Sequence, residues 1–136
     1  MKVAAFDCKK LEPIINPRRA RTMNVALVGG KTYVAGEVLG EVTASGKFDK
    51  YADAGAGGLD TARAICEYDC FVDADGNIWH GSQAGELADS KTHTPVYYTG
   101  DFRKGDLTGL TAAAVADLGR LIKGVIGDAE AILHMS

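Results

Sequence analysis

The sequence predicts a mainly β, barrel-like small domain with one short α-helix and an extended N-terminal arm. From residue 22 onward, short alternating or apolar runs are separated by glycine-containing turns about every 8 to 10 residues, which is typical of an all-β sheet or barrel. Only one segment, the alanine-rich run 112–118, has the composition of a helix. At 136 residues, with 46% hydrophobic and 24% charged residues, the chain has the size and composition of a single globular domain. We therefore divide it into an arm, residues 1–22, and a β-rich domain, residues 23–136.

The arm has no clear periodicity and differs in charge from the rest of the chain. Pro13 and Pro17 favour extended geometry in the residues that precede them. Residues 1–21 contain six lysines and arginines against two carboxylates, a net charge of +4, which leaves −7 for the remainder because the whole chain carries −3. Such an arm suits an acidic protein surface, whereas the acidic body disfavours nucleic acid as the main partner. A simple solvated terminus remains an alternative.

The β-rich domain is expected to consist of short strands joined by tight turns. Asp75 with Gly76 is a strong hairpin signal between two apolar pairs of residues. Residues 52–60 and 81–92 are expected to be loops, because they are polar or rich in glycine. The expected strands are residues 24–28, 31–34, 37–43, 47–51, 61–72, 94–99, 120–126 and 129–135.

The single helix is expected over residues 112–118. Thr111 is a suitable N-cap, and Gly119 is suited to end the helix in a left-handed conformation. Two turns of helix are too short to persist alone, so Val115 and Leu118 should pack against the body.

Metal and phosphate sites are weakly indicated. Cys66 and Cys70 with His80 and His93 suggest zinc, but the cysteines share the apolar face of an expected strand, where a buried free thiol is the simpler interpretation. The run 73–77 resembles the start of a calcium loop but lacks its glycine and glutamate, so a hairpin turn is preferred. The glycine clusters at 29–30 and 55–58 lack the ending of a phosphate-binding loop. We expect neither a metal nor a cofactor.

Catalysis and export are not indicated either. His80, His93 and His134 are the possible bases, and none lies in a nucleophile-elbow pattern. The start of the chain is interrupted by charged residues before a signal-like apolar stretch forms, and no apolar run approaches the roughly 18 to 20 residues that cross a bilayer. Three cysteines cannot all pair within one chain, which favours reduced thiols and synthesis in the cytoplasm.

Two segments resemble the head decoration proteins of lambda-like tailed bacteriophages. They are VALVGGKTYVAGEVLGEVTASGKFDKY at residues 25–51 and GDFRKGDLTGLTAAAVADLGR at residues 100–120. The first is similar to the family's glycine turn followed by G-x-V-L-G-x-V-T and then G-K with an aromatic residue. The second is similar to its G-x-F element, which leads into L-x-G-L and an alanine-rich helix ending in glycine.

This resemblance implies a β-tulip domain that forms homotrimers on the outside of the expanded head, at threefold and quasi-threefold positions, and reinforces the capsid against internal DNA pressure. It implies a non-enzymatic virion protein with no direct contact to nucleic acid or membrane. It also implies that the arm becomes ordered on the major capsid protein as an added strand. The expected capsid-binding residues of the arm are Phe6, Leu11, Ile14, Ile15, Arg18, Arg19 and Arg21. On this basis, removal of residues 1–20 should leave the body folded and abolish binding to heads.

Two other classes of function remain open. A small β-barrel ligand- or protein-binding module would be favoured by a pocket lined by Tyr68, Trp79, Tyr97 and Tyr98. A hydrolase would be favoured by convergence of His80 or His93 with a carboxylate in a cleft.

Overall fold

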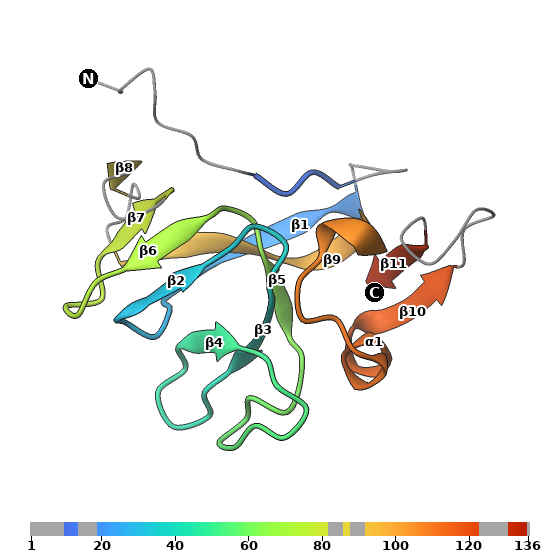
Figure 1. The fold of residues 1–136 in the computed structure, drawn as a ribbon, viewed down its shortest axis with the longest axis horizontal. Coiled ribbons are helices and arrows are strands. Elements are labelled where there is room, and N and C mark those ends of the chain that lie inside the picture. The colour runs from blue at the N-terminus through green and yellow to red at the C-terminus, as the bar shows by residue number, and fades with distance from the viewer. Residues whose placement is uncertain (1–9, 14–18, 82–85, 88–91, 123–130, 136) are drawn as a thin grey trace.

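A computed structural model describes residues 10–13, 19–81, 86–87, 92–122 and 131–135. Its described part is mainly β with one α-helix, as predicted (Figure 1). The strands are β1 Arg21–Val25, β2 Lys31–Tyr33, β3 Val38–Glu41, β4 Phe48–Lys50, β5 Ala64–Cys66, β6 Cys70–Val72, β7 Ile78–His80, β8 Glu86–Leu87, β9 Thr94–Arg103, β10 Gly119–Ile122 and β11 Ile132–Met135. The helix α1 is Ala112–Leu118, and a 3₁₀ turn covers Lys104–Asp106.

These strands form two antiparallel sheets. The larger has the order β10-β11-β9-β5-β3-β4, with β1 also paired to β9, and the smaller has the order β2-β6-β7-β8. Strand β9 runs through the middle of the molecule and joins the two halves of the larger sheet, since it pairs with β1, β5 and β11 (Figure 1).

The larger sheet curls into a half-barrel, in which the chain just after β1 is linked to the end strand β4 by one short contact. After β1 the chain crosses to β4, where the Val28 N–H donates to the Phe48 carbonyl (2.9 Å) and the Phe48 N–H donates to the Ala26 carbonyl (2.8 Å). This bridge between Leu27 and Phe48 is parallel, unlike the ladders of the sheet. It closes the seam between β1 and β4 at one end only.

The central strands are buried on both faces, because alternate residues enter two different cores. Val38, Ile65 and Tyr97 enter a core with α1 and β11, whereas Leu39 and Val96 enter a core beneath the smaller sheet. A two-sided sheet explains why these strands contain apolar residues at consecutive positions.

The predicted single strand 61–72 is wrong, since the chain changes sheets in the middle of it. Strand β5 belongs to the larger sheet and β6 to the smaller. Between them the Asp69 carboxylate accepts the Ala35 N–H (2.8 Å), and the Asp69 carbonyl accepts the Gly81 N–H (2.7 Å). Strict alternation in the sequence concealed this break because both flanking cysteines, Cys66 and Cys70, still enter the same core.

Other boundaries also shift. Residues 81–92 were expected to be loop, but Glu86–Leu87 forms β8 and pairs with β7. Strand β9 continues to Arg103, four residues beyond the predicted end, because its second half pairs with β11. The predicted closing strands are confirmed as β10 and β11 within the described residues, and residues 123–130 lie outside them.

The helix has the predicted bounds, and the Thr111 hydroxyl accepts the Ala114 N–H as the predicted N-cap (3.2 Å). The predicted left-handed geometry of Gly119 is wrong, because its φ is 161°. Glycine is required there for another reason: an added Cβ would lie 1.9 Å from the His134 carbonyl oxygen. Close approach of β11, not backbone conformation, selects the residue.

Candidate functional site

Part of the expected arm lies against the body of its own domain. Leu11 is only 4% exposed and belongs to the core cluster that contains Tyr97. Its N–H donates to the Glu67 carbonyl (2.7 Å), and the preceding Lys10 bridges Tyr68 in antiparallel fashion. This short pairing uses the backbone that becomes available where the chain changes sheets. We call these contacts the Leu11 seat.

A buried carboxylate stabilises the Leu11 seat. The Glu67 side chain accepts a hydrogen bond from the Tyr97 hydroxyl (3.1 Å), which also lies 3.3 Å from the Leu11 carbonyl oxygen. The Lys10 ammonium lies 3.6 Å from the same carboxylate. Burial and the negative charge of Glu67 raise the pKa of Tyr97 well above its usual value, so its hydroxyl remains a donor at neutral pH.

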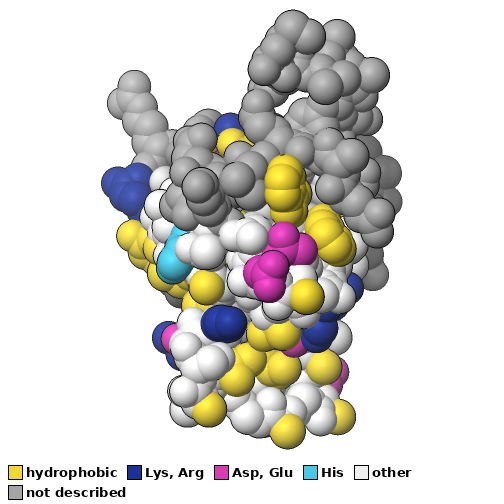
Figure 2. All heavy atoms as spheres, turned by 90° about the vertical axis from the view of Figure 1, so that its left-hand side faces the viewer, with side chains coloured by type: hydrophobic (Ala, Val, Ile, Leu, Met, Phe, Trp, Pro, Cys, Tyr) yellow, Lys and Arg dark blue, Asp and Glu magenta, His cyan; other side chains and the backbone are white. Residues whose placement is uncertain are grey.

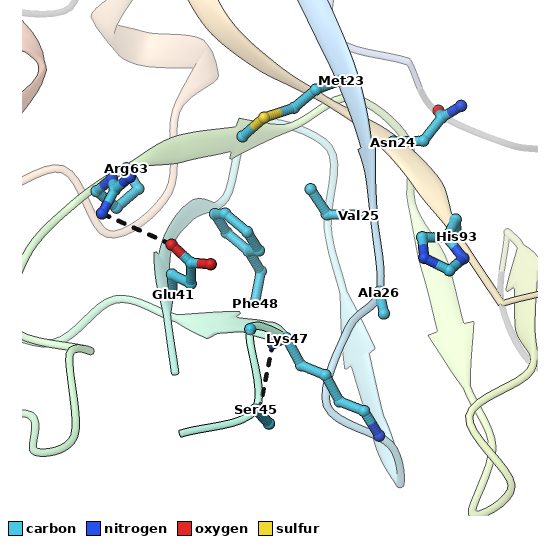
Figure 3. Close-up of a pocket in the computed structure, with 11 residues that line it drawn as sticks. Met23, Asn24, Val25, Ala26, Glu41, Ser45, Lys47, Phe48, Arg63 and His93 are labelled. Carbon is cyan, nitrogen blue, oxygen red and sulfur yellow. Dashed lines mark hydrogen bonds and ion pairs between the residues drawn. The ribbon is translucent and has the colours of Figure 1, made fainter. Parts of the chain in front are cut away.

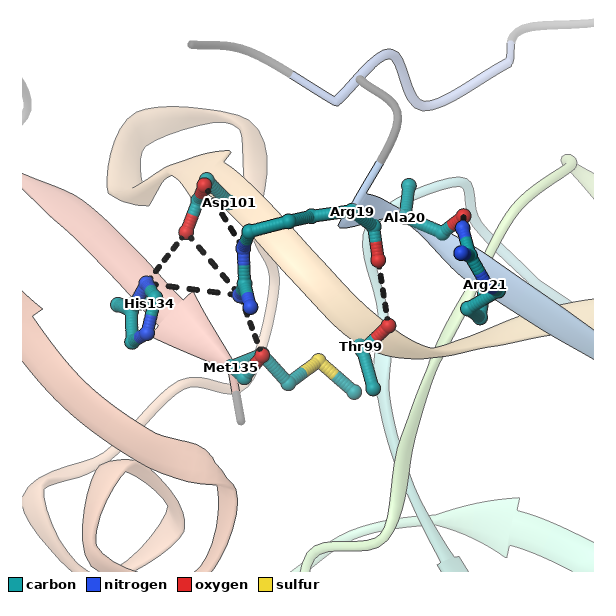
Figure 4. A network of polar contacts seen from close by, with 7 residues as sticks. All are labelled: Arg19, Ala20, Arg21, Thr99, Asp101, His134 and Met135. Carbon is teal, nitrogen blue, oxygen red and sulfur yellow. Dashed lines mark hydrogen bonds and ion pairs between the residues drawn. The ribbon is translucent and has the colours of Figure 1, made fainter. Parts of the chain in front are cut away.

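Arg19 is held by a second set of contacts at the junction of three strands (Figure 4). Its guanidinium donates to the Met135 carbonyl (2.9 Å) and lies 3.4 Å from the Asp101 carboxylate. Its own carbonyl accepts the Thr99 hydroxyl (2.7 Å). Arg19 thereby ties the start of β1 to β9 and β11.

The structure also forms a histidine–carboxylate pair that the sequence interpretation missed. His134 and Asp101 lie opposite each other on β11 and β9, and the His134 Nδ1 atom is 2.7 Å from Asp101 Oδ1. Asp101 is only 5% exposed and is shared with Arg19. Only the pairing of β9 with β11, which no local motif indicates, could have revealed it.

The remaining residues of the expected capsid-binding arm are placed as follows. Arg21 is the first residue of β1 and is exposed. The others, Phe6, Ile14, Ile15 and Arg18, lie outside the described residues. A truncation of residues 1–20 would remove both Leu11 and Arg19 from the contacts above, so a shorter truncation is the sharper test of the arm.

A cleft of about 540 Å³ lies between β1 and the turn that joins β3 to β4 (Figure 3). Strand β1 contributes Met23 to one side, and Phe48 closes the other side near the Leu27–Phe48 bridge. Arg63 and Glu41 form an ion pair at its rim (3.6 Å). This cleft was not predicted, because its two walls belong to strands that are brought together only by the curling of the sheet.

The cysteines behave as core residues. Cys66 and Cys70 are fully buried free thiols, and Cys8 lies outside the described residues. A hydrogen bond with Cys70, together with burial, raises the pKa of the Cys66 thiol, which disfavours the thiolate that metal binding or nucleophilic attack requires. Among the described residues, no group of three or more histidine, cysteine or acidic side chains could hold a metal ion.

Asp73 completes the predicted hairpin and is not arranged as a calcium ligand. One carboxylate oxygen accepts the N–H groups of Asp75 and Asn77 (both 2.9 Å), and the other accepts the Trp79 indole N–H (3.2 Å). These bonds occupy the side chain in closing the turn between β6 and β7.

The structure places the histidine and aromatic side chains proposed for other functions in different environments. His80 stacks on Tyr68 with ring centroids 4.7 Å apart, whereas His93 lies at the cleft between β1 and the β3–β4 turn. Tyr97 is in the core, but its neighbour Tyr98 points to the other face and is 42% exposed. The described part of the face in Figure 2 mixes hydrophobic and charged side chains.

Comparisons with protein-family models, curated proteins and solved structures find no match to this chain. The fold and site therefore define a class, a small mainly β domain with a curled two-sided sheet, and no particular family. Within the described residues, no helix has the length and apolar character needed to cross a membrane.

Proposed function

We propose that this protein is a capsid decoration protein, which binds the exterior of the expanded phage head as homotrimers at threefold and quasi-threefold positions. Its partner is the major capsid protein, and its role is to stabilise the head against internal DNA pressure. Many copies on one particle multiply weak individual contacts through avidity, so such a protein requires no catalytic centre.

One structural relationship carries this proposal. The two segments that resemble the decoration family, residues 25–51 and 100–120, are bonded directly to each other. The Val38 N–H donates to the Thr108 carbonyl, and the Thr108 N–H donates to the Gly36 carbonyl (both 2.9 Å). The two resembling segments are thus neighbouring parts of one structural unit, as expected if they come from a common fold.

The Leu11 seat changes how the arm should be tested. Lys10 and Leu11 already pair with the body, so the capsid-binding portion is best sought in residues 1–9, which include Phe6 and precede the Leu11 seat. Removing residues 1–9 retains Leu11 and Arg19 and should leave the body folded.

The experiment is co-sedimentation with purified phage heads before and after expansion. We expect the full chain to sediment with expanded heads alone, and the chain lacking residues 1–9 to remain in the supernatant while it keeps the circular dichroism of the full chain. Equal binding to unexpanded heads, or the absence of binding to either form, would refute capsid decoration. Undiminished binding of the truncated chain would refute only the role of the arm.

A small β-barrel binding module is the second candidate. The pocket expected for it needs Tyr97 and Tyr98 on one face, but Tyr97 lies in the core and Tyr98 is 42% exposed, so the cleft beside β1 favours this class on different residues.

A further inference from the structure

Strand β1 has one edge without a strand partner in the described part of the chain. Its other edge pairs with β9 over Arg21–Val25, and the neighbouring chain joins β4 only beyond Val25, at the Leu27–Phe48 bridge. The first four residues of β1 are exposed. An edge of this kind presents backbone N–H and C=O groups that can pair with another chain.

A cleft of about 540 Å³ lies beside this edge. The five residues of β1 extend over roughly 17 Å, at about 3.4 Å per residue. The cleft lies along Met23 to Ala26, but the Ala26 carbonyl already accepts the Phe48 N–H, so about three residues of a bound segment could pair there, beside Met23–Val25.

The cleft also offers an apolar contact for alternate side chains of such a segment. Met23 is 36% exposed, and it points from β1 into the space above Phe48 (Figure 3). Val25 and Phe48 also line the cleft but are buried, so Met23 is the exposed large apolar side chain of the lining. Added strands gain affinity from backbone bonds and specificity from contacts of this type.

The charges at the rim favour an acidic partner. Lys47 and Arg63 line the cleft against one carboxylate, Glu41, which is already paired with Arg63. His93 is the remaining titratable side chain of the lining. The lining therefore has a net charge of +1, which is that of Lys47 because Arg63 is paired with Glu41, within a chain of net −7 beyond residue 21. The chain's own basic arm would bring charge of the wrong sign, so a second copy's arm is a poor occupant.

We propose that this cleft binds an extended acidic segment of another protein as an added strand on β1, with an apolar side chain of that segment over Met23. The proposal depends on β1 and the β3–β4 turn and not on capsid attachment. Loss of peptide binding at the cleft can therefore be distinguished from loss of binding to heads.

The test uses the full ¹⁵N-labelled chain and an acetylated, amidated heptapeptide of alternating glutamate and valine. A heptapeptide of alternating lysine and valine, and free glutarate, serve as matched probes. We expect saturable amide shifts over residues 22–26 and 45–48 with the acidic peptide alone. Absence of such shifts at millimolar peptide, or equal binding of the lysine peptide, would overturn the proposal. The same shifts with glutarate would reassign the cleft to small carboxylates.

Three variants locate the binding. Met23→Glu should raise the Kd for the acidic peptide at least tenfold, and Lys47→Glu, in an exposed turn, should raise it several-fold. Ile122→Glu, at a residue of similar exposure (41%) on β10, should leave the Kd unchanged. Wild-type affinity in both Met23→Glu and Lys47→Glu, or an equal loss in Ile122→Glu, would contradict this location.

Discussion

Gly36 accepts a hydrogen bond from the Thr108 N–H at 2.9 Å and lies so close to the 3₁₀ turn that an added Cβ would be 2.1 Å from the Asp106 carbonyl oxygen. Gly36 also has a φ of +90°, in the region that favours glycine. Contact between these two backbones, which lie far apart in the sequence, therefore depends on a residue without a side chain.

We predict that Gly36→Ala is strongly destabilising. Gly30→Ala is the matched control, because Gly30 has a similar φ of +77° but open space around its Cα. Backbone strain should cost each variant about 1 to 2 kcal/mol. The clash with Asp106 should add roughly 1 to 3 kcal/mol for Gly36 alone. Urea unfolding measures both, and equal losses would contradict the close approach.

Tyr33→Phe should weaken the connection between the two sheets. The Tyr33 hydroxyl, on β2 of the smaller sheet, donates to the Asp49 carboxylate on β4 of the larger sheet (3.0 Å). The same hydroxyl also lies 2.9 Å from the Val28 carbonyl oxygen. Since the ring is fully buried, the variant keeps the packing and loses only the contacts of the hydroxyl with Asp49 and Val28, at a cost of about 1 to 2 kcal/mol in the free energy of unfolding. Tyr98→Phe, at an exposed position, is the control. A change no larger than that of the control would show that the bond contributes nothing.

Stability should fall in acid partly through Asp49. Burial raises the pKa of this carboxyl, but hydrogen bonds from Lys31, the Lys50 N–H and Tyr33 outweigh burial and lower the pKa below its usual 3.8. A depressed pKa in the folded state gives stability that is present above pH 3.8 and lost as the pH falls through the folded-state pKa. Asp49→Asn should therefore show a shallower loss of stability below about pH 4. Urea titrations at several pH values check this, and parallel pH profiles for the variant and wild type would contradict it.

Leu11→Ala tests whether the Leu11 seat belongs to the folded domain. Loss of a buried leucine side chain should cost about 2 to 5 kcal/mol if the Leu11 seat is part of the cooperative unit. Val34→Ala, at a 40% exposed apolar residue, should cost less than about 1 kcal/mol. Thermal unfolding compares the two, and a Leu11 variant as stable as wild type would restore the interpretation of a frayed terminus.

The local features of this protein follow from the sequence alone. The β class, the bounds of α1, the Thr111 cap and the hairpin at Asp75–Gly76 each depend on residues that are close in the chain. Propensity, capping and turn chemistry act over such short distances, so they can be predicted without the fold.

Tertiary structure decided the rest. Three features depend on segments that are far apart in sequence. They are the change of sheet between Cys66 and Cys70, which places β5 beside β9 and β6 beside β2, the Asp101–His134 pair, and the cleft at Met23. An alternating pattern shows that a strand has two different faces, but not which strand lies beside it. Pairing is selected by the packing of whole faces against one another, and that energy exists only after the sheet has curled.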